Sequence, residues 1–129
     1  MKLDPDCVRD ILLTVEETCT FNTKLQYNYE SCDFPRLAQY THDVLLYHIQ
    51  QADWSDLLVG VHYYDAGRCV TISDLSPEGH DFLANIRNDD NFAKIKSIGK
   101  ELGVVSLKSI MEIATSTVLM LIKNYFNLP

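Results

Sequence analysis

The sequence lacks closely spaced cysteines, which excludes the commonest zinc-binding motifs. Its four cysteines, Cys7, Cys19, Cys32 and Cys69, are separated by at least eleven residues, so no CxxC pair is present. An even number of cysteines allows disulfides, but nothing else in the sequence indicates an oxidising compartment, and free thiols are expected. We therefore predict neither a metal site nor a cofactor.

Long apolar runs are also absent. The longest stretch without a charged residue, Ile113 to Ile122, has ten residues, about half of what a bilayer-spanning helix requires. The first residues, MKLDPDCVRDILLTVEE, carry charges throughout, unlike a secretion signal. These features predict a cytoplasmic protein that does not enter a membrane.

Positive charge is scarce over the first two thirds of the chain. Residues 1–90 contain six Lys or Arg against sixteen Asp or Glu, a balance of −10, whereas residues 91–129 contain five against two, a balance of +3. The acidic part should repel a phosphate backbone, and the last third should attract one weakly.

Catalytic motifs are missing as well. The sequence contains no GxSxG turn, no HExxH helix and no glycine-rich phosphate loop. Its candidate pairs are His42 with Asp43, His80 with Asp81, and His62 with the more distant Cys69. Adjacent residues on a helix point about 100° apart, so such pairs do not form a nucleophile and base by themselves. We predict a protein that is not an enzyme.

The patterns that are present predict a single domain of mixed α and β structure. Apolar residues recur at helical spacing, behind capping residues such as Asp4, Thr41, Ser76 and Ser106, in five segments. These predicted helices span about 5–18, 41–54, 77–87, 89–102 and 107–126. A short strand is predicted at 24–30, where Leu25, Tyr27 and Tyr29 alternate with polar residues, and LLVGVHYY and RCVTISDL, joined by Asp-Ala-Gly, predict a β-hairpin.

This order of elements is typical of an α+β, winged helix-turn-helix-like domain with a reduced second helix, a small β-hairpin wing and additional C-terminal helices. Residues 1–90 would form the winged-helix-like part, and residues 91–129 a C-terminal helical extension. The blocks MKLDPDCVRDILLTVEE, YHIQQADWSDLL and LSPEGHDFLANIRND together resemble an uncharacterised family of bacteria and their phages, domain of unknown function 2513, over Met1 to Met111. The resemblance implies a phage or mobile-element protein.

Two histidines are expected to have structural roles. His48 shares a helical face with Leu45, Ile49 and Ala52, which predicts a half-buried structural side chain. The resemblance places His80 at a histidine that this family usually has after the second strand of the wing. We expect its ring nitrogens to be satisfied by local hydrogen bonds.

The outer face of the helix at 41–54 is the predicted partner-binding surface. It carries an acidic residue, an apolar residue, two aromatic residues and an amide: Asp43, Leu46, Tyr47, Trp54 and Gln50. The wing adds Tyr63, Tyr64 and Arg68, with Asp65 beside them. A DNA-reading helix presents cations and amides, whereas Tyr and Trp are enriched in protein hot spots, so a protein partner is favoured. The alternative is that the C-terminal helix covers Leu46, Tyr47 and Trp54.

The sequence is compatible with two functions. In the first, the protein is an acidic interaction module, able to inhibit a host nucleic-acid-handling or defence protein by occupying its basic groove. In the second, it is a DNA-binding regulator that contacts phosphates through Lys94, Lys96 and Lys100. For either function, the wide apolar stripe of the C-terminal helix predicts a homodimer or a deeply buried helix, and the candidate dimerisation residues are Ile113, Val118, Leu121, Ile122 and Tyr125.

Overall fold

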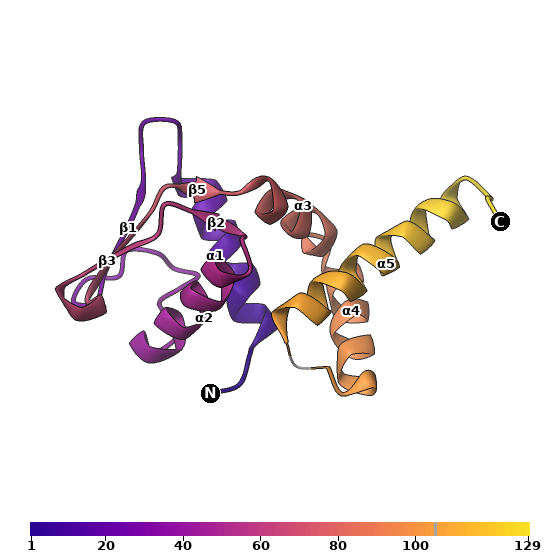
Figure 1. Cartoon of the computed structure of the whole chain (residues 1–129), viewed down its shortest axis with the longest axis horizontal. Helices are drawn as coiled ribbons and strands as arrows, with labels where there is room; N and C mark the ends of the chain where they lie inside the picture. The colour runs from indigo at the N-terminus through magenta and orange to yellow at the C-terminus, as the bar shows by residue number, and fades with distance from the viewer. Residues whose placement is uncertain (105) are drawn as a thin grey trace.

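The protein has a mixed α+β fold. The structure is a computed structural model that describes residues 1–104 and 106–129, and within these residues it has five helices and two small antiparallel sheets (Figure 1). The helices are α1 (Pro5–Thr18), α2 (His42–Trp54), α3 (Pro77–Ile86), α4 (Asp89–Leu102) and α5 (Leu107–Tyr125). The strands are β1 (Leu25–Asn28), β2 (Leu58–Val59), β3 (His62–Tyr64), β4 (Cys69–Ile72) and β5 (Asp74–Leu75), and the 3-10 turn η1 (Asp65–Gly67) joins β3 to β4. Strands β1 and β3 lie at the end of the molecule away from α5 (Figure 1).

The helix starts follow from the capping residues predicted from the sequence. The side chains of Asp4, Thr41, Ser76 and Ser106 each accept a hydrogen bond from a backbone N–H in the first turn of the following helix. Helix α4 ends at Gly103, whose φ of 72° is in the left-handed region that glycine adopts at little cost. The predicted helix bounds are therefore confirmed to within a residue or two.

The three-stranded sheet has the order β1-β4-β3, with all neighbours antiparallel. Leu25 and Tyr27 of β1 face the core opposite Ile72 and Val70 of β4. The observed strand is shorter than the predicted 24–30, because Tyr29, the last residue of the predicted alternation, lies just outside it and is 50% exposed. The chain turns away from the sheet after the Tyr29 N–H has donated a hydrogen bond to the Arg68 carbonyl oxygen.

The predicted hairpin forms, but it is divided into two ladders. Strand β3 pairs with β4, and β2 pairs with β5. Between them, Gly60 has a φ of +65°, and a Cβ atom at this position would overlap the Ser73 side chain. Glycine is therefore required where the hairpin changes direction between its two ladders.

All five helices contribute side chains to one hydrophobic core. Its buried apolar side chains include Ile11 of α1, Ile49 of α2, Leu83 of α3, Phe92 of α4 and Ile110 of α5. Ion pairs also join α1 to α4: Arg9 with Asp89 at 2.6 Å, and Asp6 with Lys96 at 3.0 Å. Helix α5 packs on α3 and α4 and extends away from the side of the molecule that carries α2 (Figure 1).

Candidate partner-binding surface

The outer face of α2 lies against the tip of the β3–β4 hairpin and forms a groove with it. Leu46, Tyr47 and Gln50 of α2 line a cavity of about 460 Å³ together with Tyr63 of β3 and with Ala66 and Gly67 of the hairpin tip. We call this cavity the α2–hairpin groove. Four residues predicted from the sequence to bind a partner are therefore brought together, although they come from two elements.

Gly67 allows the hairpin tip to approach α2 closely. Gly67 is buried with a φ of +87°, and a Cβ atom on it would lie 3.0 Å from Cδ1 of Leu46. Asp65 and Ala66 also have positive φ angles, 52° and 54°, so the whole tip is a tight left-handed turn. The missing side chain at Gly67 leaves room for Leu46 beside this turn, and the groove is already present in the unbound chain.

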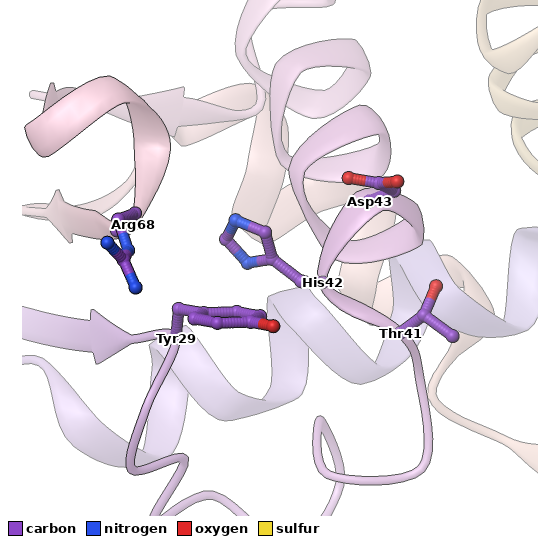
Figure 2. Close-up of a pocket in the computed structure, with 5 residues that line it drawn as sticks. All are labelled: Tyr29, Thr41, His42, Asp43 and Arg68. Atoms are coloured by element: carbon purple, nitrogen blue, oxygen red, sulfur yellow. The ribbon is translucent and has the colours of Figure 1, made fainter.

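A second hollow adjoins the groove at the start of α2, where Tyr29, Thr41, His42, Asp43 and Arg68 line a cavity of about 460 Å³ (Figure 2). Figure 2 shows the His42 ring directed toward Tyr29 and Arg68, and Asp43 directed away from them. The His42 Nδ1 atom shares a hydrogen bond of 2.8 Å with the Tyr27 hydroxyl, and its ring meets the Tyr29 ring edge-on at 4.5 Å. His42 is thus fixed by tyrosines and forms no pair with Asp43.

Aromatic side chains project into solvent around the groove. Trp54 is 66% exposed, Tyr64 54% and Tyr63 41%. The alternative that α5 covers this face is therefore wrong for Trp54, because α5 packs against α3 and α4 instead. Leu46 and Tyr47 are partly buried, but the hairpin tip and the body of the domain cover them, not α5.

The charges on this surface are mainly negative. Asp43 and Asp65 are exposed. The pKa of Asp53 is raised, first by burial and then by the nearby Asp56 carboxylate. Burial and then the nearby Asp53 raise the pKa of Tyr63. The predicted cation of the surface, Arg68, lies 3.2 Å from Glu30 and over the Tyr29 ring.

The three lysines predicted to contact phosphates do not form one patch. Lys96 pairs with Asp6 and lies over the Phe92 ring, with its Nζ atom 4.5 Å from the ring centroid. Lys96 and Lys100 border one hollow of about 240 Å³, which Lys94 does not line. At 100° per residue, Lys94 projects from another side of α4.

The predicted structural role of His48 is supported by its contacts. The ring is fully buried, with 1% exposure, rather than half-buried as expected. Its Nδ1–H donates to the Val44 carbonyl oxygen at 2.7 Å, and its Nε2 accepts from the Asp4 backbone N–H at 2.8 Å. His80 is different. Its side chain is exposed and has no hydrogen-bond partner in the part of the chain that the structure describes, so the expectation of local hydrogen bonds is wrong.

Replacing His48 with leucine is expected to destabilise the fold by about 2–4 kcal/mol, because the Asp4 N–H loses its acceptor and leucine fills the buried site less well. Urea unfolding followed by circular dichroism measures the change. His80→Leu, an exposed substitution of the same type, is the control and should change stability by less than about 0.5 kcal/mol. Equal effects of the two substitutions would contradict this role.

The residues predicted for dimerisation lie in the middle and the outer half of α5. Ile113, Val118 and Leu121 are partly buried, whereas Ile122 and Tyr125 are 46% and 83% exposed. Three further apolar residues of this region are exposed: Leu102, Leu119 and Met120. Helical periodicity alone did not separate them from core positions.

In the described residues, no helix is long and apolar enough to cross a membrane, and no three His, Cys, Asp or Glu side chains are grouped as a metal site would need. The four cysteines, all of them within these residues, are free thiols.

Comparison with known proteins identifies a family. The model of a family described as hypothetical protein (DUF2513) matches residues 2–105. No curated protein and no solved structure matches the chain. The family match covers most of the chain and agrees with the resemblance seen in its three sequence blocks, so this protein belongs to the DUF2513 family.

Proposed function

We propose that this protein is a non-enzymatic, winged-helix-like interaction module that binds a protein partner through α2 and the β3–β4 hairpin. The order of the elements and the sheet order β1-β4-β3 support the winged-helix-like assignment. A single turn at Phe34 to Tyr40, with hydrogen bonds from the Leu37 and Ala38 N–H groups to the Phe34 carbonyl oxygen, stands where such domains have their second helix.

The observation that carries the proposal is the set of exposed aromatic side chains around a preformed groove. Trp54 and Tyr63 are exposed by 66% and 41%, yet large aromatic side chains gain free energy when a partner removes them from water. Tyr and Trp dominate the binding energy of many protein interfaces. The α2–hairpin groove beside them offers a partner side chain a concave site.

The charge of the surface indicates the chemistry of the partner. Asp43 lines the hollow at the start of α2, Asp53 is near Tyr63, and Asp65 precedes Ala66 in the hairpin tip. Arg68 is already paired with Glu30. A partner with a basic rim and an apolar projection would complement this pattern. The family resemblance and the acidic charge together support a phage- or mobile-element-encoded protein that occupies the basic groove of a host nucleic-acid-handling or defence protein.

The DNA-binding alternative is less well supported. It requires phosphate contacts at Lys94, Lys96 and Lys100, but Lys96 is engaged by Asp6 and Lys94 lies on another side of α4. The outer face of α2 presents Asp43 where DNA-reading helices present cations.

Partner capture is expected to fail in the double variant Trp54→Ala/Tyr63→Ala. Hot-spot aromatics contribute about 2 kcal/mol each, so Kd should rise by roughly a thousandfold if both are buried in the complex. Trp54 and Tyr63 suit the test better than Tyr47, which is partly buried and meets the His48 ring edge-on at 5.0 Å. The measurement is affinity capture from a host lysate treated with nuclease, followed by titration calorimetry with the captured protein.

Phe21→Ala is the matched control. Phe21 is also an exposed aromatic residue, with 102% relative exposure, but it lies in the connection between α1 and β1. Capture should be unchanged in this variant. Undiminished capture by the double variant would remove this surface from consideration, and capture that is lost entirely on nuclease treatment would favour the DNA-binding alternative.

A further inference from the structure

Helix α5 is only half covered by the rest of the molecule. Its buried side chains, Leu107, Ile110, Ala114 and Thr117, all lie in its first eleven residues. Beyond Thr117, Leu119 is 52% exposed and Met120 is 65% exposed, and apolar exposure continues to Tyr125 at 83%. Figure 1 shows this second half of α5 extending away from the body of the domain. Such a concentration of exposed apolar side chains typically marks an interaction site.

An apolar groove lies beside the covered half of the same helix. Ile98 and Leu102 of α4 face Ile113 and Met120 of α5 across a cavity of about 470 Å³, and Leu102 is 67% exposed. One molecule cannot fill this groove with its own overhanging helix, because α5 is continuous and points away. A second molecule can do so if its α5 lies antiparallel to the first.

We propose that two copies of this chain associate through antiparallel α5 helices, with the overhanging half of each helix covering the α4–α5 groove of the other. The two-fold axis would pass beside the Thr117–Val118 bond. In this register residues 110–125 of the two helices overlap over about 24 Å, and each copy covers the exposed Leu119 and Met120 of the other.

Charge complementarity selects this arrangement over other occupants. Glu112 and Lys123 lie at equal distances on either side of the Thr117–Val118 bond. They also share one helical face, since the interval between them completes three turns to within about 20°. Neither forms an ion pair within the described residues. In the antiparallel dimer, Glu112 of each copy meets Lys123 of the other, so the pair forms twice.

The residues between these charges fit the same register. Ser116 lies on the face shared by Glu112 and Lys123, and in this register it is opposite Leu119 of the second copy. A small side chain opposite a large one allows two helices to approach closely. Ile113 and Met120 border the same face on the side next to the groove. The exposed face of α5 is therefore complementary to itself.

Charge-reversed variants test the register directly. Glu112→Lys places two lysines together at both contacts, and Lys123→Glu places two glutamates together. Each variant alone should dimerise with a Kd roughly thirtyfold higher than the unmodified chain, since two attractive surface pairs become repulsive. In an equimolar mixture, the introduced lysine of one variant would meet the introduced glutamate of the other while the second contact keeps its native charges, so dimers should form again.

Analytical ultracentrifugation over a wide range of concentrations measures these constants, with circular dichroism to verify the fold. Lys108→Glu is the control: it changes the charge of α5 equally but lies opposite Asn127 in this register, and its Kd should be unchanged. A monomeric unmodified chain would overturn the proposal. Charge-reversed variants that dimerise as tightly as the unmodified chain, or a mixture no tighter than its components, would overturn it too.

This proposal is independent of the one for α2 and the hairpin. Trp54→Ala/Tyr63→Ala should leave the sedimentation behaviour unchanged, because α5 packs on α3 and α4 and both residues lie outside that part of the molecule. A dimer would carry two α2–hairpin surfaces, and a partner with two sites would be bound with increased avidity.

Discussion

Gly79→Ala is expected to destabilise the protein by about 3 kcal/mol or more, since overpacking against a rigid backbone is among the costliest single substitutions. Gly79 lies in the first turn of α3, and a Cβ atom on it would overlap the Leu57 carbonyl oxygen and lie 3.0 Å from the carbonyl carbon. That carbonyl group cannot move freely, because it accepts a hydrogen bond from the Ser76 N–H at 3.0 Å. The Ser76 hydroxyl also donates to the Asp56 carbonyl oxygen, which fixes the same segment from a second side.

Gly103→Ala is the control, because it replaces a glycine without creating a steric overlap. Gly103 has a φ of +72°, but nothing lies within 4 Å of a Cβ atom built on it. Its replacement should cost about 1 kcal/mol through backbone strain alone. Urea unfolding of both variants gives the comparison. If Gly79→Ala cost no more than Gly103→Ala, α3 would not pack on the Leu57 backbone as closely as described.

The second large effect concerns alkaline pH. Burial, followed by the Asp4 and Asp10 carboxylates, raises the pKa of the Cys7 thiol from 9.0 to about 12. Below pH 9 the thiol is neutral in both the folded and the unfolded chain, and it has no effect on how stability varies with pH. Between pH 9 and 12 the unfolded chain releases the proton and the folded chain retains it. Stability is therefore lost as the pH rises, by up to about 4 kcal/mol.

Comparison with Cys7→Ala isolates this contribution, because other groups titrate equally in both proteins. The free energy of unfolding of the unmodified chain should fall more steeply above pH 9 than that of Cys7→Ala, as measured by urea unfolding at a series of pH values. Ellman's reagent at about pH 8 should label Cys7 only after unfolding, since its side chain is fully buried. Parallel pH profiles of the two proteins would contradict a neutral buried thiol.

The local structure was predictable because its determinants are close together in the sequence. Asp4 and Pro5 begin α1, Ser76 and Pro77 begin α3, and Gly103 ends α4, and each acts on backbone groups within a few residues. The hairpin was predictable from its two β-rich runs and the Asp-Ala-Gly turn. Its division into two ladders was not, since it depends on which residues of the two runs pair across the hairpin.

The candidate site was only partly predictable. Helical periodicity correctly placed Leu46, Tyr47 and Gln50 on the same side of α2, but it contains no information on what lies opposite them. Tyr29 was expected to belong to the strand and instead lies beyond its end, where it lines the hollow at the start of α2. His80 was expected to have local partners but is exposed. The buried residues at this end of α3 are instead Ser76 and Gly79, and the Gly79 N–H donates a hydrogen bond to the Ser76 hydroxyl.

The helices and their caps, the hairpin, the acidic character of residues 1–90 and, through three blocks of residues, the family all follow from the amino-acid sequence. These features depend on composition and on interactions between residues near one another in the chain. Only the tertiary structure decided which apolar side chains stay exposed. An apolar side chain favours burial wherever it stands, and whether another element covers it depends on contacts between distant segments. Helix α5 packs on α3 and α4, so Trp54 stays exposed to solvent and the end of α5 remains uncovered.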